Sequence, residues 1–202
     1  MATRVLILSP YPELIEETVT ASGCDAITRL PNMEVSDWPE TDWVISFGYR
    51  KIIQPHTIAE YGGRIINIHG SLLPYNRGAH PNFWSWWLKT PKGVTIHEVN
   101  DAIDGGKILA RCLVADRDFR YPETLLSTYN DLLVTASGLF KRTWRRILAN
   151  DIDLPARYDV QGSYHRAKDI DPFFKYLSRG WNSPVTEVTA LGDLYRGING
   201  KA

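Results

Sequence analysis

The run Ile65–His69, followed directly by Gly70, constrains the fold more than any other stretch of the chain. Its apolar residues predict a buried strand, and the glycine predicts that this strand ends in a loop, which Pro74 stiffens. Because side chains alternate across a strand, Asn67 and His69 share one face. Open α/β sheets bind ligands at the carboxyl ends of their strands, so this amide and imidazole indicate a site. The alternative, that both side chains only satisfy backbone groups of the loop, remains open from the pair alone.

Strand-like and helical segments alternate along the chain around this run. The rhythm predicts an α/β fold with a mostly parallel sheet and right-handed crossovers. In chain order, we expect strands at 4–8, 25–29, 43–47, 65–69, 93–99 and 107–114, and helices at about 13–21, 56–61, 82–88, 122–148 and 172–177. The longest of these helices has its apolar residues spaced for one buried stripe.

Length and composition fit one α/β domain with a short appendage. The chain has 202 residues, of which 44% are hydrophobic and 23% charged, an ordinary globular composition. We expect residues 1–150 to form the main domain. Residues 151–202 are too few for an independent domain, so we expect them to pack on the first part as a carboxyl-terminal extension.

Charge and cysteine content exclude several classes of function. Lysine plus arginine equals aspartate plus glutamate at 23 each, so no global field attracts a nucleic acid. Cys24 and Cys112 are far apart and lack partners at metal spacing, so neither a disulfide framework nor a metal site is expected. No apolar run approaches the roughly 20 residues that span a bilayer, and the amino terminus lacks a signal-peptide core. A cytoplasmic location without membrane contact is therefore expected.

A third polar group comes from Asp104, which precedes the pair Gly105-Gly106. Alone, such a tripeptide predicts a turn. Together with Asn67 and His69, however, the carboxylate completes the set of groups that acyl transfer to an amine requires. Amide and imidazole N–H groups hold the oxyanion, and a carboxylate stabilises the imidazolium and helps to remove the proton of the amine. A serine or cysteine nucleophile is unnecessary, because the amine attacks directly.

Several segments between about residues 44 and 114, in this order, resemble the folate-dependent formyltransferase family. These segments are Asn67–Pro74, Arg77-Gly78, Gly93–His97 and Ile103–Leu109. The resemblance implies a Rossmann-like formyltransferase fold with residues 1–150 as the catalytic domain. It also implies 10-formyltetrahydrofolate as the formyl donor, no metal, and catalytic roles for Asn67, His69 and Asp104. The folate pocket implied by the resemblance is expected to include Tyr49, Lys51, Ile52, Ile53 and Ile103.

A narrower resemblance links Tyr49–Ile53 and Arg77–Trp84 to the N-formyltransferases that modify dTDP-linked amino sugars. It implies an acceptor such as dTDP-4-amino-4,6-dideoxyglucose or a 3-amino isomer, a product used in O-antigen or other surface polysaccharide, and a homodimer. Guanidinium and ammonium groups suit a pyrophosphate, and aromatic rings suit a thymine. The expected acceptor-binding residues are Arg77, His80, Asn82, Trp84, Tyr164, His165, Arg166 and Lys168, with Trp181 and Arg157 as further candidates.

Other readings remain open. One is a glycinamide ribonucleotide formyltransferase, and another is a non-catalytic folate- or nucleotide-binding module on the same fold. A methionyl-tRNA formyltransferase is disfavoured, because it should carry an additional basic carboxyl-terminal domain. Two polar residues near the motifs are expected to be structural: His97 as a satisfied core histidine, and Ser71 as a support of the loop through a backbone hydrogen bond.

Overall fold

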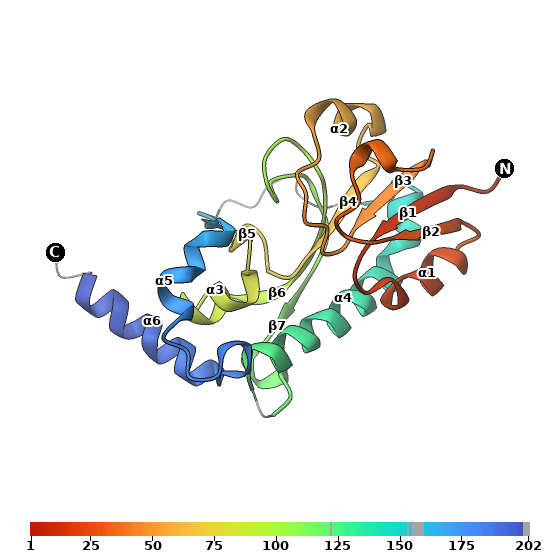
Figure 1. Cartoon of the computed structure of the whole chain (residues 1–202). Helices are drawn as coiled ribbons and strands as arrows, with labels where there is room; N and C mark the ends of the chain where they lie inside the picture. The colour runs from red at the N-terminus through yellow and green to blue at the C-terminus, as the bar shows by residue number, and fades with distance from the viewer. Residues whose placement is uncertain (122, 153, 155–159, 200–202) are drawn as a thin grey trace.

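The computed structural model describes residues 1–121, 123–152, 154 and 160–199, and its centre is a six-stranded sheet (Figure 1). The strands lie in the order β2-β1-β3-β4-β6-β7. β1 pairs in parallel with β2 and β3, and β3 pairs in parallel with β4. β6 runs antiparallel to both β4 and β7. The strands of the sheet are β1 (Arg4–Leu8), β2 (Asp25–Arg29), β3 (Trp43–Ser46), β4 (Ile65–His69), β6 (Lys92–Glu98) and β7 (Ile108–Val114). The mostly parallel α/β sheet that the sequence predicts is confirmed.

Helices cover the sheet on both faces. α1 (Glu16–Thr20) and α4 (Leu125–Leu148) lie on one face, where Ile66 and Ile68 of β4 join the same hydrophobic cluster as the apolar stripe of α4. α2 (Pro55–Tyr61) lies on the other face, where Ile58 and Tyr61 pack on the cluster of Leu6, Leu8, Val44 and Ile65. Asn67 and His69, which alternate with Ile66 and Ile68, therefore point away from α4.

The part of the chain beyond α4 returns to α3 (Pro81–Trp87), as Figure 1 shows at the left of the view. It contains α5 (Asp171–Phe174) and α6 (Val185–Asn199), and α6 packs on α3. A second sheet of two strands, β5 (Arg77–Gly78) and β8 (Tyr164–His165), joins this segment to the loop after β4. The described chain also has short 3₁₀ helices at Pro12–Leu14, Val35–Asp37, Asp116–Asp118, Ala167–Ile170 and Gly180–Asn182.

Two helical regions differ from the expectation. The helix expected at 13–21 is split into the 3₁₀ turn Pro12–Leu14 and the short α1, because Ile15 between them has φ −134°, outside the helical range. α6 was not predicted, although Pro184 and the spacing of Val185, Val188 and Leu191 are helical signals. The division of the chain at residue 150 stays a prediction. Among the described residues, no helix combines the length and apolar character needed to cross a bilayer.

Candidate functional site

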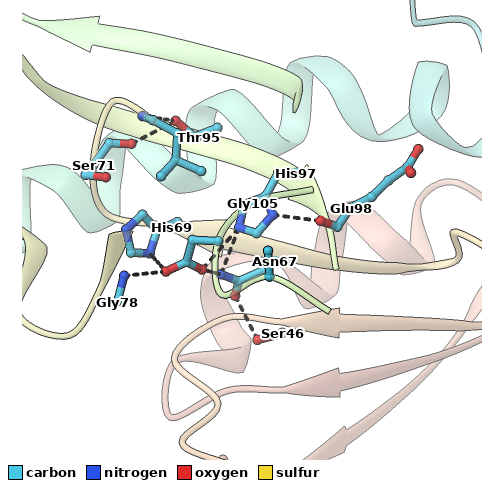
Figure 2. Close-up of polar contacts among 12 residues, drawn as sticks. Ser46, Asn67, His69, Ser71, Gly78, Thr95, His97, Glu98 and Gly105 are labelled. Carbon is cyan, nitrogen blue, oxygen red and sulfur yellow. Dashed lines mark hydrogen bonds and ion pairs between the residues drawn. The ribbon is translucent and has the colours of Figure 1, made fainter. Parts of the chain in front are cut away.

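A row of polar side chains crosses three neighbouring strands. Ser46 of β3 is in register with Asn67 of β4, and Asn67 is in register with His97 of β6, so the three side chains share one face. The Ser46 hydroxyl donates to Asn67 Oδ1 over 2.8 Å (Figure 2). This contact fixes the orientation of the amide, and its Nδ2 group then faces His97 and Asp104.

The Asn67 amide nitrogen faces two side chains. Nδ2 lies 3.2 Å from His97 Nε2 and donates to Asp104 Oδ1 over 3.2 Å. His97 Nδ1 donates to the Glu98 carbonyl oxygen over 2.8 Å, and its Nε2 also lies 3.4 Å from Asp104 Oδ1. His97 is buried and satisfied, as expected, but it also touches two of the three predicted catalytic residues. That contact was not predicted.

Asp104 lies in the loop between β6 and β7 with a left-handed φ of 47°, which aspartate tolerates better than most residues. Its Oδ2 accepts from the Gly78 backbone N–H over 2.7 Å. Gly106 allows this loop to close, since a Cβ there would lie 1.8 Å from the Glu98 carbonyl oxygen. Burial alone would raise the pKa of Asp104, but the charge of His69, the contacts with His97 and the Gly78 amide outweigh it and hold this pKa well below its ordinary value.

His69 lies at the end of β4 with both ring nitrogens facing acceptors. Nε2 donates to the Asn76 carbonyl oxygen over 3.0 Å, and Nδ1 lies 3.5 Å from Asp104 Oδ2. The His69 side chain is 8% exposed and that of Asp104 is 11% exposed, so water contributes little to this arrangement. A doubly protonated imidazolium satisfies both contacts. Asn67, His69 and Asp104 thus form one cluster, as the sequence leads us to expect.

Hydrogen bonds of Ser71 and Thr95 hold the loop after β4. The Ser71 hydroxyl donates to the Tyr75 carbonyl oxygen over 2.6 Å, which is the supporting role expected for it. Thr95, fully buried on β6, donates to the Ser71 carbonyl oxygen and accepts from Leu73 N (Figure 2). The loop that carries Asn76 and Gly78 therefore has a fixed base. The support from Thr95 was not predicted, because it depends on the pairing of β4 with β6.

The predicted folate residues lie in two segments next to this cluster. Residues 49–53 follow β3, whose last residue Ser46 touches Asn67, and Ile103 precedes Asp104. Ile52 is 71% exposed and Ile103 is 43% exposed, so both offer apolar surface to a ligand.

The other predicted folate residues have side-chain contacts within the protein. Tyr49 donates to the Met33 carbonyl oxygen, Lys51 pairs with Glu34, and Ile53 lies in the core. The Tyr49 hydroxyl is therefore engaged within the protein, and Ile53 has mainly its backbone groups available for a pterin.

Four of the predicted acceptor residues come together at the β5–β8 ribbon. Arg77 pairs with Tyr164, and Gly78 pairs with His165. His80 lies against Trp181, with ring centroids 5.5 Å apart. Among the described residues, Arg77 Nε and His165 Nε2 are buried without a hydrogen-bond partner. Burial lowers the pKa of His165, although Asp169 opposes this shift.

The structure corrects the expectation for two acceptor residues. The buried Asn82 amide donates to the Leu125 carbonyl oxygen and to Thr128 Oγ1, and so it joins α3 to α4. Trp84 is 4% exposed and stacks on His165 with centroids 4.1 Å apart. Neither side chain has surface for a nucleotide, because α3 is enclosed by α4, α6 and the returning segment. We therefore leave both out of the candidate acceptor site.

The remaining predicted cations lie at the surface. Arg166 pairs with Asp169 over 3.4 Å, and Lys168 is exposed. Arg157 falls outside the described residues. In the described part of the chain, no group of three or more histidine, cysteine, aspartate or glutamate side chains is arranged to hold a metal ion.

Comparisons with known proteins agree on one family. A family model described as formyl transferase matches residues 32–118. The solved formyltransferase PseJ from Anoxybacillus kamchatkensis is 31% identical, with a TM-score of 0.83 over 94% of this chain and 99% of PseJ. A sugar N-formyltransferase from Shewanella sp FDAARGOS_354 is 21% identical, with a TM-score of 0.75 over 95% of this chain and 88% of that protein. At that identity, the second likeness shows the fold alone.

Two curated proteins match shorter parts of the chain. A formyltetrahydrofolate deformylase from Corynebacterium sp. (strain P-1) is 34% identical over 102 residues, which are 49% of this chain and 35% of the deformylase. The bifunctional polymyxin resistance protein ArnA from Wigglesworthia glossinidia brevipalpis is 30% identical over 154 residues, which are 74% of this chain and 22% of ArnA. The chain thus spans about a third or less of the length of these curated relatives.

Proposed function

Because the chain belongs to the formyltransferase family, we propose that it transfers a formyl group from 10-formyltetrahydrofolate to the amine of a nucleotide-linked amino-dideoxyhexose. The observation that carries this proposal is the buried cluster of Asn67, His69 and Asp104, in which each member contacts at least one other. PseJ supports the choice of substrates, because its structure is a complex with UDP-4,6-dideoxy-4-formamido-L-AltNAc and tetrahydrofolate.

The residues of the cluster have complementary roles in this reaction. The neutral amine attacks the formyl carbon, and negative charge develops on the formyl oxygen. Asn67 Nδ2–H and His69 Nδ1–H donate to this oxyanion, while His69 Nε2–H stays on the Asn76 carbonyl oxygen. Since Asn67 Nδ2 already faces His97 and Asp104 in the free protein, the oxyanion shares an amide hydrogen with one of them. The new sugar N–C bond then remains, and the bond to the folate nitrogen breaks.

Asp104 assists the proton transfer in this scheme. Its low pKa keeps the carboxylate ionised, so it stabilises a charged His69 and the positive charge that develops on the attacking amine. The proton that the amine loses passes to the departing folate nitrogen, which balances the step. A serine or cysteine nucleophile takes no part, because the amine itself forms the new bond.

The acceptor is proposed to lie along the β5–β8 ribbon. Arg77 and His165 each bury a nitrogen that lacks a partner among the described residues, and the exposed Arg166 and Lys168 add positive charge. These groups suit a pyrophosphate, and the half-exposed Trp181 suits a pyrimidine. The dTDP-linked sugar implied by the sequence and the UDP-linked sugar of PseJ share this chemistry. Their bases differ by one methyl group and their riboses by one hydroxyl group.

A panel of acceptors tests the proposal. Purified protein and 10-formyltetrahydrofolate are incubated with dTDP- and UDP-linked 3-amino and 4-amino sugars, with glycinamide ribonucleotide, and without an acceptor, and products are identified by mass. We expect an N-formyl sugar nucleotide. Formylation of glycinamide ribonucleotide alone would favour the rival transferase. Formate release without an acceptor product would indicate a deformylase, and folate binding without turnover would indicate a non-catalytic module.

We also propose that the protein is a homodimer that supplies N-formyl sugars for surface polysaccharide. Near its end, α6 exposes the apolar side chains Leu194, Tyr195 and Ile198, at 61%, 46% and 66%. A second copy of the chain would cover such a surface. Sedimentation should show a dimer for the parent and a monomer for the Leu194→Glu, Ile198→Glu double variant. A monomeric parent would contradict this proposal.

A further inference from the structure

The segment Gly162–His165, which we call the strap, lies along the loop that follows β4. Ser163 N donates to the Pro74 carbonyl oxygen, and Arg77 N donates to the Ser163 carbonyl oxygen over 2.9 Å. At Gly162, a Cβ atom would lie 2.4 Å from the Pro74 carbonyl oxygen, so the two backbones are in direct contact. The strap is about 90 residues away from this loop in the sequence and lies beyond the part that the family model matches.

The Ser163 hydroxyl holds Asn76 at two points. It accepts from Asn76 N over 2.8 Å and donates to Asn76 Oδ1 over 3.1 Å. Asn76 Nδ2 donates to Thr90 Oγ1 over 2.7 Å. Asn76 is fully buried and has a left-handed φ of 56°. Its backbone and its side chain are therefore both fixed, and Ser163 supplies two of the contacts that fix them.

The carbonyl oxygen of Asn76 accepts from His69 Nε2 over 3.0 Å. Because a carbonyl oxygen only accepts, this contact places a hydrogen on Nε2 and sets the plane of the ring. The chain of contacts thus runs from Ser163 through Asn76 to His69. The same loop also carries the Gly78 N–H that donates to Asp104, next to the pairing of Gly78 with His165.

We propose that Ser163 is a positioning residue for His69: through Asn76, its hydroxyl holds the imidazole in the orientation that formyl transfer requires. This inference rests on the proposed function, since it assigns Ser163 to the same reaction. A group that orients a catalytic side chain affects the transition state more than the binding of substrates. Loss of the hydroxyl should therefore lower kcat and leave both KM values nearly unchanged.

The kinetic test compares three variants. Ser163→Ala should lower kcat by about 10- to 100-fold, the range found when an outer contact of a catalytic group is lost, with KM for donor and acceptor within about twofold. Ser163→Thr, which keeps the hydroxyl, should restore most of kcat. Ser178→Ala is the matched control. Within the described chain, the Ser178 hydroxyl donates to Glu187 and makes no other hydrogen bond. It should retain the parent kcat. A kcat for Ser163→Ala within twofold of the parent would overturn the proposal.

A second measurement needs no substrate. With isotope-labelled histidine, NMR follows exchange of the His69 Nε2 hydrogen with water, and the spectrum of His69→Asn assigns the signal. Exchange should be faster in Ser163→Ala than in the parent and in Ser178→Ala. Unchanged exchange would overturn the positioning role even if kcat falls. If the parent formylates no amine, the proposed function fails, while faster exchange in Ser163→Ala would still support the contact from Ser163 to His69.

Discussion

At the scale of single residues, Asn67 is held by three partners in the free protein. Ser46 donates to its oxygen, and His97 and Asp104 face its amide nitrogen. The amide therefore keeps its orientation when it shares a hydrogen with an oxyanion. Such pre-organisation is what an oxyanion donor needs.

The first prediction concerns this donor. Asn67→Ala should raise the activation free energy by about 2.7–4 kcal/mol, the usual effect of removing one oxyanion donor. Steady-state kinetics with the best acceptor of the panel measures this, and Asn130→Ala, an exposed position on α4, is the control. A loss of kcat/KM below about tenfold, which is about 1.4 kcal/mol, would mean that Asn67 is a structural residue.

Asp104 links the site to the pH dependence of stability. Its pKa in the folded protein is lowered, so its ionised form stabilises the fold. This contribution is fully present above the unfolded pKa of about 3.9 and is lost as the pH falls through the folded pKa. The difference in unfolding free energy between the parent and Asp104→Asn should therefore shrink as the pH falls below about 4. Denaturant titrations across this range measure it, with the exposed Asp101→Asn as the control. A difference that stays constant with falling pH would contradict the assignment.

At the scale of elements, the β5–β8 ribbon joins the loop after β4 to the strap. Gly78, the last residue of β5, has φ 87°, and a Cβ there would lie 2.2 Å from the His165 carbonyl oxygen. Gly23 has nearly the same φ, 86°, with nothing within 4 Å of the added Cβ. An alanine would therefore be strained by the positive φ at either position. Only at Gly78 would its Cβ also clash with a neighbouring atom.

This contrast makes a matched pair of variants. Gly23→Ala should lower the free energy of unfolding by about 1–2 kcal/mol, the cost of a left-handed residue with a Cβ. Gly78→Ala should cost about 1–3 kcal/mol more, because the ribbon must open to admit the methyl group. It should also lower kcat, since Gly78 N donates to Asp104. Thermal and chemical denaturation measure the two costs. Equal costs with full activity would show that the ribbon has no part in the site.

Substitutions of two tryptophans distinguish a packing role from a ligand-binding role. Trp84 is buried against His165, so Trp84→Ala should cost about 3–5 kcal/mol of stability. Trp181 is 43% exposed, so Trp181→Ala should cost little stability and weaken nucleotide binding by about 0.5–1.5 kcal/mol. Denaturation and calorimetry with UDP and dTDP measure both quantities. Unchanged nucleotide binding by Trp181→Ala would remove Trp181 from the acceptor site.

The elements differ in how well local sequence predicts them. Apolar runs such as those of β1 and β4 specify buried strands, and the bounds of both were predicted. β5 and β8 have two residues each, too few to show the alternating pattern that indicates a strand. Their pairing therefore depends on the overall fold and could not be predicted from local sequence. Asn82 and Trp84 were assigned to a ligand because they lie in the stretch Arg77–Trp84 that resembles the sugar N-formyltransferases. Asn82 is buried against α4 and Trp84 against His165, and local sequence indicates neither contact.

At the scale of the whole molecule, the segment after α4 completes the candidate site. It packs α6 on α3, covers Trp84 with His165, and places Ser163 against Asn76. The positions of Asn67, His69 and Asp104 on strand ends and a glycine-rich loop were predictable, because they follow from local pattern. The roles of Ser46, His97 and Ser163 in holding them were not, because strand register and long-range packing create those contacts.

Direct formyl transfer from folate to a sugar amine is the step proposed for the cluster of Asn67, His69 and Asp104. The most direct test is a single-turnover experiment in which carbon-labelled 10-formyltetrahydrofolate and the amino-sugar nucleotide are mixed with excess enzyme, and NMR follows the labelled carbon. We predict that the label moves to the sugar nitrogen without passing through formate, and that His69→Asn, while still binding UDP or dTDP, slows this step by about 10²- to 10⁴-fold. Label that appears as formate, or transfer by His69→Asn at the parent rate, would contradict the account.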